Sequence, residues 1–474
     1  MYLEIKNNQT IIKSDIPIEP FECLRKDLSL KKMRVIQFFV NEENGKKRLY
    51  CIFTENETVE EPKLYVTSCY IENSFESISK TNPALHLFER EIYENFGIEP
   101  IGHPWLKPVR KMDNYTFLKS DDNQTHEVAV GPVHAGIIEP GHFRFLCNSE
   151  RINHLEIQLG YQHRGVEKLL KQKPTVQLAE SICGDSTIAN ALTFAHAIEG
   201  LSNISVDEKS EIIRKIALEM ERIAIHIGDL GAIAEDIAYK MGSAVFGVTR
   251  TLIINTLLEI SGSRFGKGLI KLGGVNFDID SVIKEKILNT LAEANKRVDK
   301  MMNAMNNNAS VLSRLEKTAV LGTKQAKEIG AVGMAARACN IKIDARKFDD
   351  YNFEIITTGG GDVHSRFYLR YLEIKQSSKI IEELLQKSEE KTDSLRAKIN
   401  LSPNSFIVSI TESWRGELSH AIITDENGFI QTYKIKDPSF NNWLGLAMAN
   451  RNGQISNFPV CNKSFNLSYC GFDL

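Results

Sequence analysis

The chain has 474 residues, more than a single hydrophobic core usually organises, so we expect two or more domains. Apolar residues make up 42% of it and charged residues 25%, with a formal net charge of −3. This balance is typical of a soluble globular protein and argues against nucleic acid as a partner. The amino terminus lacks the basic flank and apolar run of a signal peptide, and no stretch approaches the roughly eighteen uninterrupted apolar residues of a membrane span, so we expect a cytoplasmic chain.

Strands and helices are predicted to alternate in the first part of the chain. The segments RVIQFFV (34–40) and RLYCIFT (48–54) are strand-like and are separated by the turn-rich NEENGKK, which predicts an antiparallel hairpin. Between residues 85 and 98, apolar side chains recur every three or four positions, as on one face of a helix. Gly97 and Pro100 are expected to stop that helix.

A polar, unpatterned segment from 111 to 127 follows, and we place the domain boundary there. Beyond it, helical periodicity runs through three long segments, 209–242, 281–312 and 365–399, which are expected to pack as an antiparallel bundle. Residues 406–436 change to a period of two around a DENG turn, which predicts a small sheet that caps the bundle.

These patterns define an α+β fold class. We expect a small amino-terminal α+β domain (1–115), a linker (116–126), and a mainly helical bundle domain with small peripheral β-sheets (127–474). Eight cysteines are scattered singly along this chain, which argues against a disulfide framework and suits a reducing compartment. Most of them are expected to be buried small apolar side chains.

Several motifs resemble known respiratory subunits. The segment LFEREIYENFGIEPIGHPWLKPVR (87–110) resembles the smaller, C-type subunit of NADH-quinone oxidoreductase, respiratory complex I. Other motifs resemble its D-type subunit and the related large subunits of nickel-iron hydrogenases: GPVHAGIIEPGHFRF (131–145), LGYQHRGVEKLL (159–170), DLGA (229–232), ESWRGELSHAIITDENG (412–428) and KDPSFNN (436–442). Both types in one chain are most similar to the large subunit of membrane-bound, energy-converting hydrogenases such as formate hydrogenlyase. The resemblance implies the hydrogenase large-subunit fold for the second domain.

The resemblance also implies where a nickel-iron centre would lie, because those hydrogenases hold it with four cysteines in two Cys-x-x-Cys pairs. Here the first pair is Cys183-Gly-Asp-Ser186, and near the carboxyl end Ser468 and Gly471 stand at the ligand positions, with Cys470 beside the second of them. One thiolate of four is not expected to assemble the centre, so we predict no metal ligands and no nickel. A buried, inert thiol is the favoured interpretation of Cys183 over a ligand or redox role.

Three residues are candidates for proton transfer in the cavity that the resemblance implies. Asp229, in the DLGA motif, matches an acidic residue of the quinone pocket of complex I, and a helix-face acid paired with a base is an equally supported alternative. Glu139 matches the proton-relay glutamate of the hydrogenases, with a structural salt bridge as the alternative. His134 lies close to it in the same motif. The quinone-contacting histidine of complex I is replaced here by Pro140, so a quinone is a candidate ligand without its best-placed donor.

Basic residues form a second group of candidates. Arg415 matches the arginine of the family's RGE motif beside the cavity and is the arginine that we assign to function. His163 and Arg164, in QHRG, are candidates to lie near a partner's iron-sulfur cluster, although a satisfied core histidine is the favoured interpretation of His163. For Arg164, Arg337 and Arg366, bridging of helices to neighbouring loops is favoured over function.

The sequence supports no nicotinamide site of its own. The glycine run TTGGGD (357–362) lacks the GxGxxG order and a βαβ context, and it is expected to form a turn before a helix near His364. NAD(H) therefore enters only through the resemblance to complex I.

The first hypothesis is an electron-transfer and coupling subunit of an oxidoreductase complex, without nickel, that is peripheral on the cytoplasmic side of the inner membrane. Its expected partners are an iron-sulfur small subunit, which carries the cluster, and membrane ion-translocating subunits. The second hypothesis keeps the architecture with a vestigial, redox-inactive cavity and retains conformational or proton coupling. A functional hydrogenase with unusual ligands is the least supported.

Overall fold

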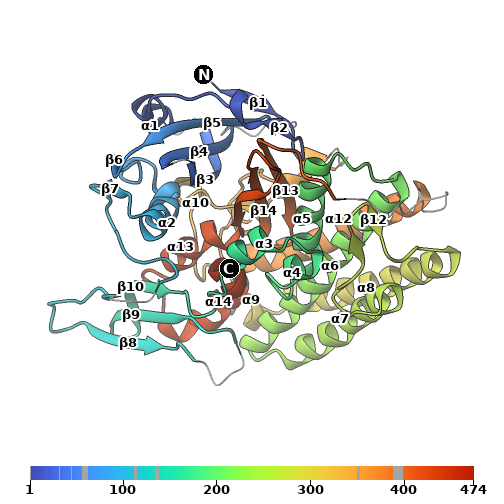
Figure 1. The fold of residues 1–474 in the computed structure, drawn as a ribbon. Coiled ribbons are helices and arrows are strands. Elements are labelled where there is room, and N and C mark those ends of the chain that lie inside the picture. The colour runs from blue at the N-terminus through green and yellow to red at the C-terminus, as the bar shows by residue number, and fades with distance from the viewer. Residues whose placement is uncertain are drawn as a thin grey trace.

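The computed structural model describes residues 2–30, 33–43, 45–55, 62–111, 115–133, 138–349, 353–387 and 399–474. Figure 1 shows an amino-terminal sheet at the top, a bundle of long helices at the lower right and the carboxyl-terminal segment in the centre between them. The predicted α+β class with a helical second part is confirmed.

The amino-terminal sheet has the order β1-β5-β4-β3 and is antiparallel throughout. Its strands are β1 (Leu3–Ile5), β3 (Met33–Glu43), β4 (Lys46–Glu55) and β5 (Leu64–Ile71). The predicted hairpin is confirmed as β3 and β4, with Arg34 opposite Thr54. Helices α1 (Phe21–Ser29) and α2 (His86–Phe96) contact β5 and β3 of this sheet, and the short strands β6 (Ser74–Glu76) and β7 (Glu99–Ile101) pair in parallel beside α2.

Helix α2 ends where the sequence predicted. Gly97 has φ +65°, a left-handed conformation that costs glycine little, and its backbone N–H caps Tyr93 O. The capped end directs the chain back along β7 toward the second part of the molecule.

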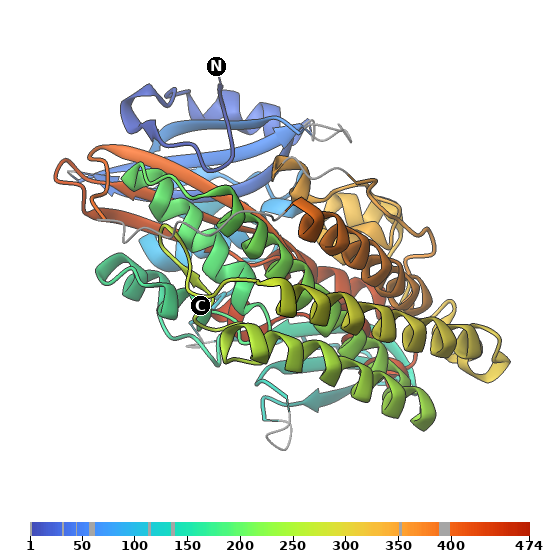
Figure 2. The ribbon, with the colours of Figure 1, turned by 90° about the vertical axis from the view of Figure 1, so that its right-hand side faces the viewer.

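Long helices form the bundle that was predicted from periodicity. They are α5 (Thr187–Ser202), α6 (Glu208–Asp236), α7 (Lys240–Ser261), α8 (Ser281–Asn306) and α12 (Val363–Lys387), and they run side by side in Figure 2. Asp207 and Asp280 cap α6 and α8 by accepting backbone N–H groups of their first turns. Shorter helices connect them: α3 (Val166–Gln172), α4 (Val176–Glu180), α9 (Ala309–Leu315), α10 (Thr323–Glu328) and α11 (Gly333–Arg337).

The predicted helical segments differ from the observed helices mainly at their ends. The segment 209–242 is divided, because Ala238 takes a left-handed φ of +61° and α7 begins two residues later. The segment 281–312 is divided at Asn308, whose side chain caps α9. Helix α12 begins at Val363, directly after the glycine run, and residues 388–398 of the third predicted segment lie outside the described residues.

A second antiparallel sheet has the order β15-β14-β13-β2. Its strands are β13 (Ser405–Ser413), β14 (Gly416–Thr424) and β15 (Ile430–Lys436), and β2 (Ile11–Ile12) joins from the amino-terminal region. The predicted turn between the last two strands is confirmed. The sheet is not peripheral, however, because every residue of β13 and β14 is buried. One face packs on the amino-terminal sheet through residues such as Tyr50 and Phe406, and α5 contacts the sheet as well.

A third sheet and the last helices complete the fold. Strands β8 (His126–Val130), β9 (His142–Asn148) and β10 (Arg151–Gln158) form an antiparallel sheet at the lower left of Figure 1, and β11 (Ile270–Lys271) pairs with β12 (Gly274–Val275). Helices α13 (Ser439–Ala449), α14 (Phe458–Phe465) and α15 (Tyr469–Asp473) carry the chain into the centre of the molecule.

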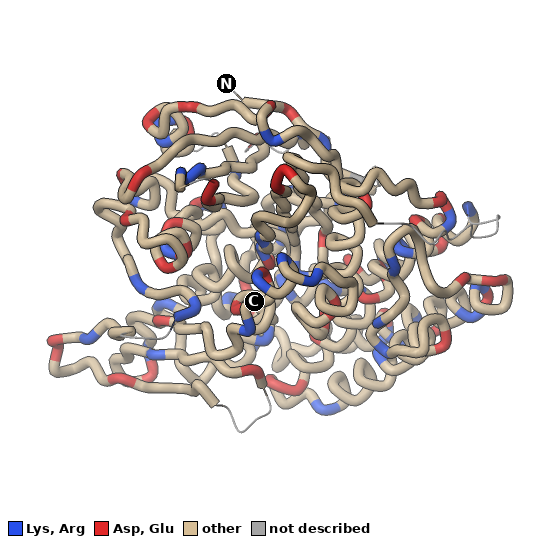
Figure 3. The backbone as a smooth tube through the Cα atoms, in the orientation of Figure 1, with Lys and Arg blue, Asp and Glu red and all other residues tan. Residues whose placement is uncertain are grey.

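Charged residues of both signs occur in all parts of the described chain, as the tube in Figure 3 shows. By length and composition α7 could cross a membrane, with a mean hydropathy of 1.3, but core helices of soluble proteins pass the same test and α7 packs along α6 and α8.

A buried ion triad joins the two large sheets. Arg34 on β3 donates to both carboxylate oxygens of Glu417 on β14 at 2.9 and 2.6 Å, and Lys436 on β15 donates to the same carboxylate at 2.9 Å. Burial acts to raise the pKa of Glu417, but the two cations outweigh it and lower the pKa to about 2. The interface between the sheets therefore depends on an ionised Glu417.

We expect Glu417→Gln to lower the free energy of unfolding by about 3–5 kcal/mol, because it leaves two buried cations without a counter-charge. Since the folded pKa lies below the ordinary value of 4.5, the wild-type contribution is present above pH 4.5 and is lost as pH falls toward 2. Urea denaturation at several pH values measures both effects. Glu22→Gln, which removes the exposed ion pair with Arg25, is the control and should change nothing measurable. Equal effects of the two substitutions would contradict the assignment.

Candidate functional site

Cys183 lies in the turn between α4 and α5, where it meets the carboxyl-terminal segment. Its sulfur lies 3.1 Å from the hydroxyl of Ser468, a residue 285 positions later in the chain. Ser468 caps α15, and its hydroxyl accepts the backbone N–H of Gly471 at 2.8 Å. The turn and the cap thus bring together the two segments that the resemblance to hydrogenases pairs.

Arg415 closes this site from the turn between β13 and β14. Its guanidinium donates to both carboxylate oxygens of Asp185 at 2.6 and 2.8 Å, and it reaches Cys183 Sγ at 3.5 Å and Ser186 Oγ at 3.3 Å. It also lies against the Trp414 ring, with Cζ 3.9 Å from the ring centroid. The turn is built on glycine, because the Cβ of any other residue at Gly333 would collide with the backbone of residues 415 and 416.

The ion pair fixes the charges in this site. Burial opposes ionisation of both partners, but each stabilises the charge of the other, so the pKa of Arg415 is raised well above its ordinary value and that of Asp185 is lowered. The neighbouring Cys470 thiol, burial and Asp185 raise the pKa of Cys183 well above its ordinary value, against the opposing effect of Arg415. At neutral pH Cys183 is therefore a thiol, and it donates to Asp185 Oδ1 at 3.0 Å.

Asp229 is connected to Arg415 through one residue, Asn466. The amide of Asn466 donates to Asp229 Oδ1 at 2.7 Å, and the backbone O of Asn466 accepts from Arg415 Nε at 2.6 Å. Asp229 also forms a buried ion pair with Arg370 on α12 at 3.0 Å, and Lys463 lies 3.6 Å away. Asp229 has the base partner that the alternative interpretation expected, its role in proton transfer stays a prediction, and the same carboxylate anchors the segment that carries Ser468.

Glu139 lies at the edge of the site, while His134 lies outside the described residues. Glu139 is half-buried, and one of its carboxylate oxygens is 3.5 Å from the backbone N of Cys470. The motif therefore places a carboxylate beside Cys470, at a contact too long to be a strong hydrogen bond.

His163 and Arg164 hold the carboxyl-terminal residues against the Cys183 turn. The backbone N–H of Arg164 donates to Leu474 O at 2.8 Å, and its guanidinium donates to the carbonyl oxygens of Ser181 and Ile182 at 2.8 and 2.9 Å. This confirms that Arg164 bridges neighbouring loops. His163 is exposed, so the prediction of a core histidine is wrong, and its Nδ1 lies 2.7 Å from Asp473 O.

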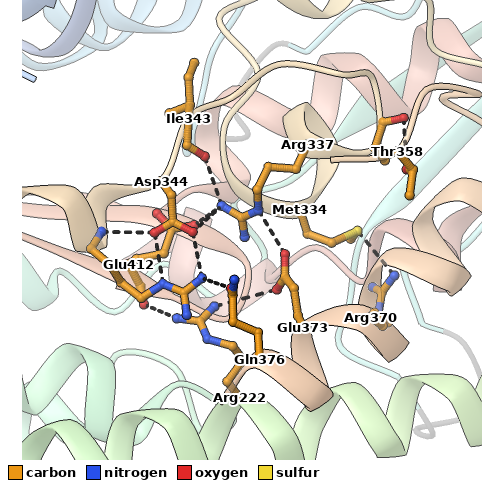
Figure 4. A network of polar contacts seen from close by, with 12 residues as sticks. Arg222, Met334, Arg337, Ile343, Asp344, Thr358, Arg370, Glu373, Gln376 and Glu412 are labelled. Carbon is orange, nitrogen blue, oxygen red and sulfur yellow. Dashed lines mark hydrogen bonds and ion pairs between the residues drawn. The ribbon is translucent and has the colours of Figure 1, made fainter. Parts of the chain in front are cut away.

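The remaining arginines bridge helices and loops, as predicted. Arg366 donates to Gly361 O at 2.7 Å and Ala319 O at 3.0 Å. Arg337 donates to Glu373 at 2.9 Å and Glu412 at 2.6 Å, and it is shown in Figure 4 between these carboxylates and Asp344. The buried network around Arg337 contains three arginines and four carboxyl groups: Arg222, Arg337, Arg346, Glu219, Asp344, Glu373 and Glu412.

One further group among the described residues has metal-ligand chemistry. Ligand atoms of His196, Glu199 and Glu211 lie within 4.8 Å of one another. Arg214 pairs with Glu199 at 2.6 Å and with Glu211 at 2.7 Å, so a guanidinium already supplies the positive charge there. The group is a buried ion-pair cluster that fixes α5 to α6.

Sequence reasoning missed Asp185 and Asn466 as members of the site. Asp185 stands inside the quoted Cys-Gly-Asp-Ser turn, and a buried arginine needs a carboxylate partner, so the signal was present. Asn466 carried no signal, because its side-chain amide and its backbone carbonyl contact Asp229 and Arg415, which lie far away in the sequence.

The class of protein follows from the bundle, the enclosed sheet and this arginine-lined site at the carboxyl-terminal segment. Residues 12–126 match the family described as respiratory-chain NADH dehydrogenase, 30 kDa subunit, and residues 238–404 match the 49 kDa subunit. The chain belongs to the family of complex I D-type subunits and membrane-bound hydrogenase large subunits, with a C-type domain fused in front.

Individual relatives agree with this family. The chain is 30% identical to the D-type NADH-quinone oxidoreductase subunit of Carboxydothermus hydrogenoformans, over 67% of this chain and 91% of the relative. It is 29% identical to the membrane-bound hydrogenase subunit alpha of Pyrococcus furiosus, over 72% and 85%. It is 25% identical to formate hydrogenlyase subunit 5 of Escherichia coli, over 83% and 76%. A chain from the archaeal membrane-bound sulfane sulfur reductase shares the fold, with a TM-score of 0.69, 21% identity, and coverage of 75% of this chain and all of that one.

We expect Asp229→Asn to loosen the carboxyl-terminal segment, because Arg370 then lacks a buried counter-charge and Asn466 loses a charged acceptor. Amide hydrogen exchange of peptides that cover residues 466–474 should become at least about tenfold faster, which corresponds to about 1.4 kcal/mol of lost local stability.

Asp299→Asn is the matched control, since Asp299 pairs with Lys375 on the same helix as Arg370 but is 44% exposed. Exchange in the carboxyl-terminal peptides should be unchanged in that variant. Unaltered exchange in Asp229→Asn would show that Asp229 does not hold the segment.

Proposed function

We propose that this chain is an electron-transfer and coupling subunit of a membrane-attached oxidoreductase complex and that it works without a nickel-iron centre. The coarse part of this statement rests on the family, whose members are subunits of respiratory and hydrogenase complexes. The absence of nickel and the identity of the electron acceptor go beyond what the family shows and belong to the proposal.

The observation that carries the proposal is the chemistry at the four positions where the related hydrogenases place cysteine ligands. They are Cys183, Ser186, Ser468 and Gly471, which offer one thiol and two hydroxyls. The hydroxyl of Ser468 already caps α15, and the guanidinium of Arg415 lies 3.5 Å from Cys183 Sγ. Cys183 is the one sulfur ligand at these four positions, and a guanidinium cation lies beside it. Such a set of groups does not fit a nickel-iron centre, so no step is assigned to one.

The residues around Cys183 include groups that suit a reaction in which electrons arrive together with protons. Glu139 lies beside Cys470, and the Asp185–Arg415 pair lies beside Cys183. Ionised Asp185 accepts a hydrogen bond from Cys183, and the guanidinium offers a fixed positive charge to a substrate that becomes negative on reduction. These properties support the binding and reduction of a quinone, or of another small electron acceptor, beside a partner's iron-sulfur cluster. NAD(H) has no assigned role in this chain.

The proposed partners follow from the names of the relatives and from the position of the site. An iron-sulfur small subunit would cover the exposed side of His163 and Arg164, which border the Cys183 turn. Membrane ion-translocating subunits would complete the complex, and this chain would then lie at the cytoplasmic side of the inner membrane.

A second candidate function, coupling without a redox reaction, is favoured by the buried network around Arg337. Its four carboxyl groups outnumber its three arginines, so one more proton balances the charge. Burial and Asp344 raise the pKa of Glu412 to about 7, and burial lowers the pKa of His226, so the proton rests on Glu412. A proton held inside the bundle near neutral pH is what a proton-coupled conformational device requires.

The first candidate predicts iron and acid-labile sulfide without nickel in the complex purified through a tag on this chain. Elemental analysis gives the metals, and electron paramagnetic resonance of the reduced complex should show an iron-sulfur signal that a soluble quinone abolishes by oxidation. Arg415→Gln should slow that oxidation by at least about tenfold, which corresponds to about 1.4 kcal/mol in activation free energy. Stoichiometric nickel would refute the metal-free proposal, and a cluster signal that no quinone oxidises would refute the quinone.

The second candidate predicts a pH dependence of stability that depends on Glu412. Because the folded pKa is raised above the ordinary 4.5, the folded state binds this proton more tightly than the unfolded state, so stability falls as pH rises from 4.5 through about 7. In Glu412→Gln this part of the decline should be absent, while the exposed control Glu382→Gln should keep it. Urea midpoints across this pH range measure the difference, and identical profiles in all three proteins would remove the support for this candidate.

A further inference from the structure

We propose that Cys183 and Cys470 form a reversible dithiol–disulfide pair that holds two electrons in the cavity. The pair itself stands on geometry, whereas its use as an electron store rests on the proposed function. From the sequence alone, Cys183 is interpreted as an inert thiol and Cys470 as a residue beside an abandoned ligand position.

The two sulfur atoms share one hydrogen-bonding partner. The hydroxyl of Ser468 lies 3.1 Å from Cys183 Sγ and 3.5 Å from Cys470 Sγ, although Cys183 and Ser468 come from segments 285 positions apart. The effect of the Cys470 side chain on the pKa of Cys183 is a second sign that the thiols are neighbours. Two thiols that share one small hydroxyl are close neighbours, which is the first requirement for a disulfide.

The two cysteines differ in access, which assigns them different roles. Cys183 is 1% exposed, whereas Cys470 is half-buried at the edge of the site beside Glu139. A small oxidant therefore meets Cys470 first. Cys183 lies behind it, with its S–H directed at Asp185 Oδ1 and with the Arg415 guanidinium 3.5 Å from its sulfur. The proton of Cys183 leaves with the released small thiolate, and the guanidinium stabilises the negative charge that forms on the Cys183 sulfur.

Other cysteines in the described part of the chain lack this arrangement. Cys339 donates its S–H to Leu321 O at 3.1 Å, which satisfies a buried thiol without a second sulfur. Cys51 and Cys69 are both fully buried on neighbouring strands β4 and β5, so no oxidant reaches either of them. Cys461 is 2% exposed and belongs to the preceding helix α14. Cys183 and Cys470 thus combine a shared partner, a carboxylate and an accessible sulfur.

The reaction with a small-molecule disulfide balances in two exchanges. Cys470 sulfur attacks one sulfur of the oxidant, which breaks the oxidant's S–S bond, forms a mixed disulfide and releases one small thiol. Cys183 sulfur then attacks Cys470 sulfur, which forms the Cys183–Cys470 bond and releases the second small thiol. Two protein thiols are oxidised, one small disulfide is reduced, and the two protein protons pass to the two released thiolates. In the complex, two successive one-electron transfers from a partner cluster that is reduced twice, together with two protons, would restore the dithiol.

The test is a thiol count on the intact complex purified through a tag on this chain. The complex is reduced, freed of reductant, treated with oxidised glutathione, denatured in a maleimide and analysed by peptide mass spectrometry. We expect the thiols of Cys183 and Cys470 to be lost together as one cross-linked peptide pair and both to return with dithiothreitol, with the exposed Cys23 counted separately. A complex in which glutathione stays on Cys470, or in which neither cysteine reacts, would overturn the pair.

Variants separate the two roles. In Cys183→Ser the mixed disulfide between glutathione and Cys470 should accumulate, because the second exchange is blocked, whereas in Cys470→Ser neither cross-link nor mixed disulfide should form at this site. Cys461→Ala is the matched control and should cross-link as the wild type does. Because the wild-type peptide map needs no variant, the proposal stays testable if Cys183→Ser fails to fold.

The proposed function fails by different observations. A complex without iron and sulfide, or with stoichiometric nickel, would refute the electron-transfer assignment whatever the thiol count. A cross-link that persists when the partner cluster is reduced would refute the use of the pair as an electron store, while an absent cross-link beside a normal cluster signal would refute the pair alone.

Discussion

The structure depends on arginine side chains that lie inside the bundle and are neutralised there by carboxylates. Arg337 connects α11, α12 and β13 through Glu373 and Glu412 (Figure 4), and Arg370 connects α12 to α6 through Asp229. A buried guanidinium without a partner costs several kcal/mol, so each of these residues restricts the position of the elements that carry its acceptors. The same constraint applies between the two large sheets, where Glu417 neutralises Arg34, and in the site, where Asp185 neutralises Arg415.

The site is assembled where this scaffold meets the carboxyl-terminal segment. Asn466 is the connection, because one of its groups contacts Asp229 of the bundle and another contacts Arg415 of the sheet turn. A change in the charge of Asp229 or of Arg415 would therefore alter the positions of the residues that surround Cys183. Arg370, which pairs with Asp229, and Glu373, which pairs with Arg337, both lie on α12, so this helix contributes a residue to the site's support and to the protonatable network.

Periodicity and motifs predicted much of the fold but only part of the site. The β3–β4 hairpin, α2 with its Gly97 cap and the long helices followed from local pattern, because burial of one face dictates the spacing of apolar residues. The enclosure of β13 and β14 could not be seen, since the residues that cover them come from distant segments. In the site, Arg415 and Asp229 were identified through motifs, whereas the bridge through Asn466 combines a side-chain contact to Asp229 with a backbone contact to Arg415, and both partners come from distant segments. The exposure of His163 was also misjudged, because its contact is with the backbone of Asp473, 310 positions away in the sequence.

The great sequence separation within the site has a consequence for folding kinetics. Cys183 meets a residue 285 positions away, and the strand at Ile11–Ile12 joins the sheet at Ser405–Phe406. A contact between residues so far apart in the sequence requires closure of a long loop, which costs entropy before the contact can stabilise the fold. Such contacts therefore form slowly and after local helices and hairpins. The cavity should therefore be the last region to acquire its native geometry, and a cluster-bearing partner that recognises this surface would select only chains whose folding is complete. Binding of the partner would then admit only completely folded chains to the complex.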